Sequence, residues 1–159
     1  IKGIKLLAKY DYSFDVLVKS TQLSEVCELV EKLPVMNLVV DHIAKPNIAM
    51  QQWSGWQEYI SKLANYEHIY CKLSGMVTEA NWKTWNSNDL FPYINHCIEK
   101  FGSRRCMFGS DWPVCHLASD YYSLIECIDV VIQKENEQVK ENIFSIAAAT
   151  FYRINLDSK

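Results

Sequence analysis

Four short apolar runs, separated by longer amphipathic segments, constrain the fold of this chain more than any other feature. Each run is rich in β-branched or aromatic residues and ends at residues that break a strand. The four runs are Phe14–Val18, Asn37–His42, His68–Leu73 and Arg105–Ser110. None of them alternates strictly between apolar and polar residues, which indicates strands that are covered on both faces.

The segments that follow these runs repeat apolar residues at helical spacing. They are Gln22–Leu33, Trp53–Leu63, Asp89–Phe101, Ser119–Gln133 and Val139–Ile154. Strand starts lie roughly 25 to 35 residues apart, which is typical of successive parallel βα units with right-handed crossovers. Two α/β architectures fit this pattern: a small doubly wound sheet, or half of a (β/α)8 barrel, which usually needs about 250 residues.

The composition is typical of one globular domain, with 49% hydrophobic and 22% charged residues among 159. A net charge of −3 without a basic block argues against nonspecific binding to nucleic acid or to a membrane surface. The six cysteines form no CxxC pair, which favours reduced thiols in a cytoplasmic protein. The chain starts without Met, inside the amphipathic stretch IKGIKLLAKY, so we expect a fragment of a longer protein.

Ionisable residues follow three of the four predicted strands. Asp41 and His42 end the second, Lys72 lies near the end of the third, and Asp111 follows the fourth. Ligands bind at the carboxyl ends of parallel strands in both candidate architectures. A purely structural sheet would more often close with turn residues alone, so this convergence predicts a catalytic site.

Each of these residues also has a structural interpretation. Asp111 could cap the next segment, although an acid beside Trp112 would be partly desolvated and could serve as a base. His42 could be a core histidine with satisfied hydrogen bonds. Lys72 could be exposed, since an inward lysine requires a carboxylate or a substrate anion. Asp15 could hold a loop in place.

Other aromatic and imidazole side chains are weaker candidates. Trp82 and Trp85 could form a sugar-binding wall, because aromatic faces stack on apolar ring faces, or could pack a loop. His68, His96 and His116 are expected to lie outside the site, although His116 is near the relevant edge.

Metal binding has little support from the residues alone. His42 and Asp111 are of the types that bind zinc or manganese, but two ligands do not make a site. The sequence contains no HxH or HExxH motif.

Three motifs together resemble the amidohydrolase superfamily: DHIAKP (Asp41–Pro46), YCKLSGM (Tyr70–Met76) and MFGSDWPVC (Met107–Cys115). The resemblance is to the amidohydrolase-related group of sugar lactonases and pyrone-dicarboxylate lactonases, especially its fuconolactonase-like branch. FDVLVKSTQL (Phe14–Leu23) and FYRI (Phe151–Ile154) match in order and spacing. The resemblance implies that residues 1–159 form the C-terminal part of a (β/α)8 barrel, in a domain that lacks its N-terminal half.

The resemblance also implies hydrolysis of a cyclic ester. Asp111 would be the general base that takes a proton from water, and His42 would bind the substrate or polarise its carbonyl. Lys72, Trp112, Lys45 and Asp15 would be substrate-binding residues. No cofactor is required in several such lactonases, whereas other branches need zinc or manganese. The HxH pair of the family's first strand has no counterpart in this sequence.

Two other functions remain open at this point. One is a metal-dependent decarboxylase of the same superfamily, and the other is a truncated interaction module whose partner is the missing half or another copy. A nucleotide-binding domain is disfavoured because no Gly-rich loop follows any strand. The substrate is expected to be a small molecule, and the isolated 159 residues are expected to be weakly active or inactive.

Overall fold

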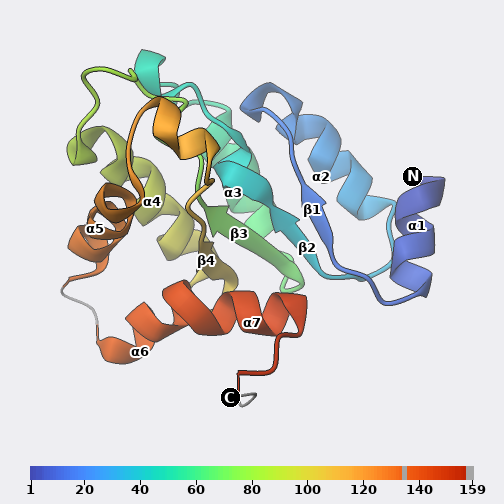
Figure 1. The fold of residues 1–159 in the computed structure, drawn as a ribbon. Coiled ribbons are helices and arrows are strands. Elements are labelled where there is room, and N and C mark those ends of the chain that lie inside the picture. The colour runs from blue at the N-terminus through green and yellow to red at the C-terminus, as the bar shows by residue number, and fades with distance from the viewer. Residues whose placement is uncertain (134–135, 157–159) are drawn as a thin grey trace.

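The computed structural model describes residues 1–133 and 136–156. Within these ranges four parallel strands form a sheet in the order β1-β2-β3-β4 (Figure 1). The strands are β1 (Phe14–Val16), β2 (Leu38–Val40), β3 (Ile69–Leu73) and β4 (Cys106–Phe108). Because all pairs are parallel, the carboxyl ends of the strands meet at one edge.

Helices connect and follow the strands. They are α1 (Lys2–Lys9), α2 (Leu23–Glu31), α3 (Trp56–Ala64), α4 (Ser87–Phe101), α5 (Tyr121–Ile132), α6 (Glu137–Glu141) and α7 (Ala147–Tyr152), with a π-helical turn η6 (Asn142–Ile146) between the last two. Short 3₁₀ turns are η1 (Ser20–Gln22), η2 (Asp41–Ala44), η3 (Ile48–Met50), η4 (Ser103–Arg105) and η5 (Val114–Leu117). None of the helices in the described ranges is long and apolar enough to cross a membrane.

The two faces of the sheet are covered differently. One face packs against α2 to α5 and forms the main core, which includes Val40 and Cys71. On the other face Val39 and Met107 pack against Phe151 of α7. Helix α7 lies across the amino-terminal half of the sheet (Figure 1). All six cysteines are buried and free, in agreement with the prediction of reduced thiols.

The order of the strands decides between the two predicted architectures. A doubly wound sheet reverses its strand order at a switch point, whereas the described strands follow one another as they do along the chain. Successive right-handed crossovers in that order place the connecting helices on one face, as observed for α2 to α4. The fold is therefore a four-stranded portion of a barrel-type α/β structure.

The predicted strands are correct in place but too long. The second was expected over Asn37–His42, yet β2 ends at Val40 because the backbone φ becomes positive at His42. The first was expected to reach Val18 and ends at Val16.

Caps account for the differences at the helix ends. Helix α3 begins at Trp56 and not at Trp53, because Glu58 accepts a hydrogen bond from the backbone N–H of Gly55. The segment predicted as one helix, Val139–Ile154, is divided by η6 and ends at Tyr152. Arg153 follows with a φ of 56°, which ends the helix.

Candidate active site

The site is built around an irregular turn that follows β2. Residues His42, Ile43, Ala44 and Lys45 all have positive φ, between 47° and 59°. Left-handed backbone costs a non-glycine residue about 1–2 kcal/mol, and a β-branched residue such as Ile43 rarely adopts it. Strain of this kind persists only where surrounding contacts impose it, and it gathers at functional sites.

Buried contacts hold this turn in place. The indole Nε1 of the fully buried Trp56 donates a hydrogen bond of 2.7 Å to the carbonyl of Ile43. The backbone N–H of Lys45 donates to the carbonyl of His42 at 2.8 Å. Ile43 and Ala44 are themselves fully buried. The turn therefore fixes the imidazole of His42 at the carboxyl end of the sheet.

His42 contacts polar groups through both ring nitrogens. Its Nε2 lies 3.2 Å from Asp41 Oδ2 and 3.6 Å from Asp111 Oδ1. Its Nδ1 lies 2.7 Å from the hydroxyl oxygen of Ser74. Burial lowers the pKa of His42 below its ordinary value, although the negative charges of Asp41 and Asp111 act in the opposite direction. The ring is therefore neutral near pH 7.

Lys72 forms a second charged group on the same side of the sheet. Its ammonium lies 2.7 Å from Asp15 Oδ2 and 3.0 Å from Asp41 Oδ1. The hydroxyl of Tyr152 donates to the same Asp15 oxygen at 2.6 Å. Burial opposes the charge on Lys72, but contacts with Asp15, Tyr152 and Asp41 outweigh it and raise the pKa of Lys72. Lys72 is thus a permanent cation in the site.

The strand register explains why Lys72 meets Asp15. Asp15 pairs with Val39 and Lys72 pairs with Met107, so all four side chains point to the face that α7 covers. The carboxylate of Asp15 and the ammonium of Lys72 therefore approach each other on the face of the sheet that α7 covers, beside Tyr152.

Asp111 delivers a buried carboxylate from the segment after β4. Its φ is 56°, and its side chain is only 12% exposed. Within the described residues, its buried Oδ2 has no hydrogen-bond partner. Burying a carboxylate oxygen without a partner is costly, so such an atom is a candidate to bind water or substrate.

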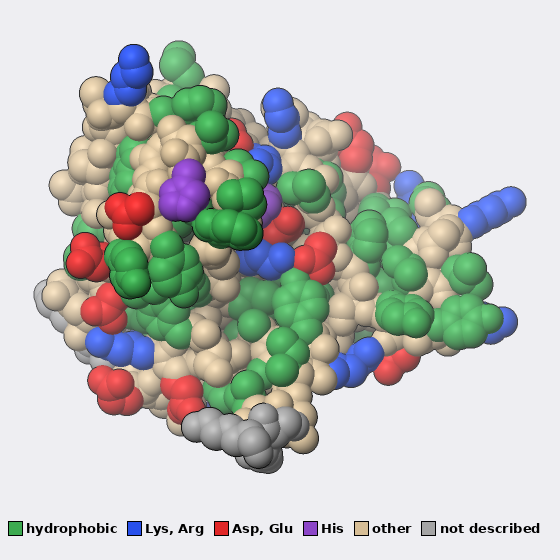
Figure 2. Space-filling view, in the orientation of Figure 1, with side chains coloured by type: hydrophobic (Ala, Val, Ile, Leu, Met, Phe, Trp, Pro, Cys, Tyr) green, Lys and Arg blue, Asp and Glu red, His purple; other side chains and the backbone are tan. Residues whose placement is uncertain are grey.

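Negative charge exceeds positive charge in this cluster. Asp15 and Asp41 pair with the one ammonium, that of Lys72, and Asp41 and Asp111 lie beside the neutral imidazole of His42. Figure 2 shows acidic, basic and histidine side chains gathered near the centre of the molecular surface that it draws, among hydrophobic side chains. The cluster offers a carboxylate base beside hydrogen-bond donors, which suits attack of water on a carbonyl.

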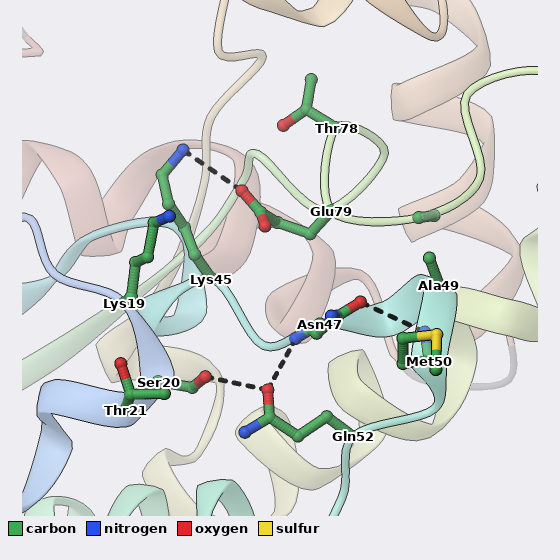
Figure 3. A pocket seen from close by; sticks show the side chains of 11 residues that line it. Lys19, Ser20, Thr21, Lys45, Asn47, Ala49, Met50, Gln52, Thr78 and Glu79 are labelled. Carbon is green, nitrogen blue, oxygen red and sulfur yellow. Dashed lines mark hydrogen bonds and ion pairs between the residues drawn. The ribbon is translucent and has the colours of Figure 1, made fainter.

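A surface cavity of about 620 Å³ opens along the loops that follow β1, β2 and β3 (Figure 3). Lys45 and Glu79 point toward one another there, with Nζ and Oε1 3.5 Å apart. Gln52 Oε1 accepts hydrogen bonds from the hydroxyl of Ser20 and the backbone N–H of Asn47. Lys45, predicted as a substrate-binding residue, therefore lines this polar cavity and does not enter the charged cluster.

The structure brings together four of the predicted site residues, namely Asp111, His42, Lys72 and Asp15. Trp112 follows Asp111 directly but is 68% exposed, so it does not bury the carboxylate.

The side chains regarded as weaker candidates lie elsewhere. His96 packs against Trp53 and Trp56 and contacts the hydroxyl of Ser61. His68 packs on the ring of Tyr66. The other candidates, Trp82, Trp85 and His116, lie in loops at the carboxyl edge of the sheet. The indole Nε1 of Trp85 donates a hydrogen bond to the carbonyl of Ala118. Trp82 is half exposed, and His116 is exposed.

Sequence reasoning did not assign roles to Asp41, Ser74 and Tyr152. Asp41 precedes His42 directly, so its position at a strand end was a usable signal. Ser74 lies in the motif that follows Lys72, but a lone serine before glycine is common at strand ends. Tyr152 reaches the site only because α7 folds back on the sheet, which a local pattern does not reveal.

Comparisons with known proteins show which family this chain belongs to. Residues 2–154 match the family described as amidohydrolase. The chain is 36% identical over 137 residues to L-fucono-1,5-lactonase of Burkholderia multivorans, covering 80% of this chain and 46% of that protein. It is 33% identical over 166 residues to L-fucono-1,5-lactonase of Burkholderia ambifaria, covering 98% of this chain and 55% of that protein.

A solved structure shares the fold. An amidohydrolase from Burkholderia multivorans, crystallised with bound zinc, aligns with a TM-score of 0.93 and 31% identity. The alignment covers 97% of this chain and 57% of that one. The chain thus spans about half the length of the curated relatives it matches.

The zinc in that neighbour raises the question of a metal site in this chain. In residues 1–133 and 136–156, no group of three or more His, Cys, Asp or Glu side chains is arranged to hold a metal ion. The position between Asp15 and Asp41 is taken by the ammonium of Lys72. The described side chains therefore do not by themselves provide a set of zinc ligands.

The family match covers nearly the whole chain, and a relative and a solved structure above 30% identity agree with it. The chain belongs to the amidohydrolase family.

Proposed function

We propose that the protein containing this chain hydrolyses a sugar-derived lactone, with Asp111 as the general base. One observation carries the assignment: the carboxylate of Asp111 lies beside the imidazole of His42 through Oδ1, and its buried Oδ2 has no hydrogen-bond partner in the described residues. The proposal is supported by relatives named L-fucono-1,5-lactonase, and by a more distant one from Scheffersomyces stipitis named L-rhamnono-gamma-lactonase.

The reaction needs one water molecule and no redox step. Asp111 accepts a proton from water as the water oxygen attacks the lactone carbonyl carbon. The carbonyl oxygen becomes an oxyanion, which accepts a hydrogen bond from the His42 ring. The bond from the carbonyl carbon to the ring oxygen then breaks, and Asp111 returns the proton to that oxygen. The product is the open hydroxy acid.

Lys72 supports this chemistry through its charge. Its ammonium is already engaged by Asp15 and Asp41, so its single positive charge is shared between two of the three carboxylates. Among the described residues Lys72 forms ion pairs with Asp15 and Asp41 but not with Asp111. Asp111 therefore keeps an oxygen, Oδ2, available for water. We assign Lys72 and Asp15 to the floor of the substrate site, where they meet hydroxyl groups of the substrate.

The polar part of the substrate extends toward the cavity lined by Lys45. Ammonium, amide and carboxylate groups of Lys45, Gln52 and Glu79 can donate to and accept from several hydroxyls, which suits a polyhydroxylated ring. The exposed indole of Trp112 covers the apolar face of that ring from the solvent side.

The proposed mechanism uses the side chains of this chain and no metal ion. It operates in the cytoplasm, where six buried, free cysteines are stable. Because the relatives are about twice as long, we also propose that further strands outside these 159 residues complete the barrel.

The test is a hydrolysis assay on the natural full-length protein with a panel of five- and six-membered sugar lactones. Opening of the ring releases acid, which a pH-stat measures after subtraction of uncatalysed hydrolysis. We expect catalysis of at least one sugar lactone, retained after chelator treatment. Release of CO₂ from an aromatic acid, abolished by chelator and restored by zinc or manganese, would replace the proposal with a decarboxylase.

A further inference from the structure

We infer that Ser74 is a positioning residue that holds His42 as the Nε2–H tautomer, so that His42 acts as a hydrogen-bond donor and not as a base. The inference rests on the proposed function for its catalytic consequence, but the tautomer itself follows from the contacts of the ring. Ser74 thereby becomes a further residue of the site. His42 donates a hydrogen bond, and Asp111 takes the proton from water.

The carboxylates decide which ring nitrogen carries the proton. Nε2 faces Asp41 Oδ2 at 3.2 Å and Asp111 Oδ1 at 3.6 Å, and both of these atoms are acceptors. A deprotonated Nε2 would direct its lone pair at negative oxygens. A protonated Nε2 instead presents its hydrogen to these oxygens, which is electrostatically favourable, so the neutral ring carries its hydrogen on Nε2.

Ser74 supplies the complementary contact at the other nitrogen. Its hydroxyl oxygen lies 2.7 Å from Nδ1, and the residue is only 2% exposed. In the Nε2–H tautomer, Nδ1 is an acceptor, and a hydroxyl can donate to it. The hydroxyl thus gives the buried Nδ1 a hydrogen bond in place of the one that water would make to it in the unfolded chain.

Packing prevents the ring from turning away from these contacts. A Cβ on Gly75 would lie 2.8 Å from both Cγ and Nδ1 of His42, so the backbone of Gly75 lies directly against the ring. A Cβ on Gly109 would lie 3.1 Å from the Cβ of Ser74, so the serine is confined in turn. The left-handed turn fixes the backbone of His42 itself.

Burial keeps the ring neutral in the working range of pH. Burial lowers the pKa of His42, and the ammonium groups of Lys45 and Lys72 act in the same direction. Asp41 and Asp111 act against them. A neutral Nε2–H ring cannot take a proton at Nε2, so proton abstraction from water falls to Asp111.

The direct test is nitrogen NMR of the full-length protein labelled with ¹⁵N in histidine. Correlation of the two ring nitrogens with the ring carbon-bound hydrogens shows which nitrogen is protonated, and a His42→Gln variant identifies the signals of this ring. We expect Nε2 to be the protonated nitrogen at neutral pH. A neutral ring protonated on Nδ1 would overturn the inference.

The kinetic test is the Ser74→Ala variant. We expect kcat to fall roughly 5- to 30-fold with a smaller change in KM, since the loss of one hydrogen bond acts on the donor in the transition state. The Nδ1 signal should move away from that of a hydrogen-bonded acceptor. A Ser74→Cys variant, which keeps a weak donor, should recover part of kcat and of the signal.

The chain offers a matched control in its second serine–histidine pair. The hydroxyl of Ser61 lies 3.1 Å from Nε2 of His96, between α3 and α4. Ser61→Ala should leave both kcat and the His42 signals unchanged. If Ser74→Ala leaves them unchanged as well, Ser74 has no positioning role.

The two proposals fail separately. An Nε2–H ring in a protein that opens no lactone would refute the proposed reaction and leave the tautomer standing. An Nδ1–H ring in an active lactonase would refute the role of Ser74 and leave the reaction standing.

Discussion

The environment of His42 shows how much of this site depends on single residues. The ring contacts Asp41 and Asp111 on one edge and Ser74 on the other, while Gly75 borders its face. None of these contacts is made by a long flexible side chain. The position of the ring should therefore be sensitive to substitutions that add or remove one or two atoms.

Gly75→Ala tests that sensitivity. The new Cβ would lie 2.8 Å from the ring of His42, and the φ of 62° is unfavourable for alanine. We expect at least a tenfold loss of kcat/KM and a destabilisation of about 1–3 kcal/mol, measured by kinetics and by denaturant unfolding.

Gly102→Ala is the matched control. Gly102 also has a positive φ, 74°, but a Cβ there would meet nothing within 4 Å. It should share the backbone cost in stability and retain activity. Equal losses of activity in both variants would mean that contact with the ring is unimportant.

The buried His42 also predicts how stability depends on pH. Because burial lowers the pKa of the folded-state ring, the unfolded chain binds its proton at higher pH than the folded chain. The stability contributed by the neutral ring is complete above the ordinary histidine pKa of about 6.5 and is lost as pH falls below it. In urea titrations between about pH 7 and 5, His42→Gln should therefore lose less stability than the wild type. Parallel pH dependence in the two proteins would contradict this.

At the scale of elements, the left-handed turn after β2 is the feature that places the site. It spans His42 to Lys45 and contains no glycine, although every residue in it has positive φ. Residue propensities would not predict such a turn, which explains why the strand was expected to continue to His42. Buried contacts hold its conformation, among them the hydrogen bond from Trp56 to the carbonyl of Ile43.

Trp56→Phe should loosen this turn. The variant removes the Nε1 donor and leaves the Ile43 carbonyl buried without its partner, which costs about 1–3 kcal/mol. We expect lower stability together with lower kcat, because His42 moves with the turn.

Trp85→Phe provides the comparison, since its Nε1 donates to the Ala118 carbonyl, away from His42. This variant should lose stability and keep kcat. A fully active Trp56→Phe enzyme would show that the turn does not depend on that bond.

The sequence located these elements but not the contacts between them. Apolar runs bounded by breakers predicted all four strands, and helical spacing predicted the main helices, because these signals are local. The ionisable residues at the ends of three predicted strands indicated that Asp111 and His42 would lie close together. The pairing of Lys72 with Asp15 and Tyr152 could not be predicted, since it depends on strand register and on a helix 137 residues from β1.

At the scale of the whole molecule, the described sheet has two open edges. Strands β1 and β4 each pair on one side within the described residues. Near β1, large apolar side chains on α1 and after it are exposed, including Leu6, Tyr12 and Leu17. Figure 2 shows hydrophobic side chains gathered over this part of the molecule, where Figure 1 places α1. An open edge beside an apolar patch favours association.

The isolated 159-residue chain should therefore self-associate with increasing concentration, as measured by analytical ultracentrifugation. Leu17→Lys, directly after β1, should reduce the association because a charge there opposes strand pairing. Val35→Lys adds the same charge at a residue that is 81% exposed and should have no such effect. A chain that stays monomeric at high concentration would contradict this account of its edges.

The central claim is that Asp111 is the base that activates water. The most direct measurement is kcat/KM for lactone opening by full-length wild type and Asp111→Asn, with Asp120→Asn as control because Asp120 only caps α5. We expect a loss of about 10²- to 10⁴-fold for Asp111→Asn with folding preserved, and no more than a small change for the control. Activity of Asp111→Asn within a few-fold of the wild type would contradict it.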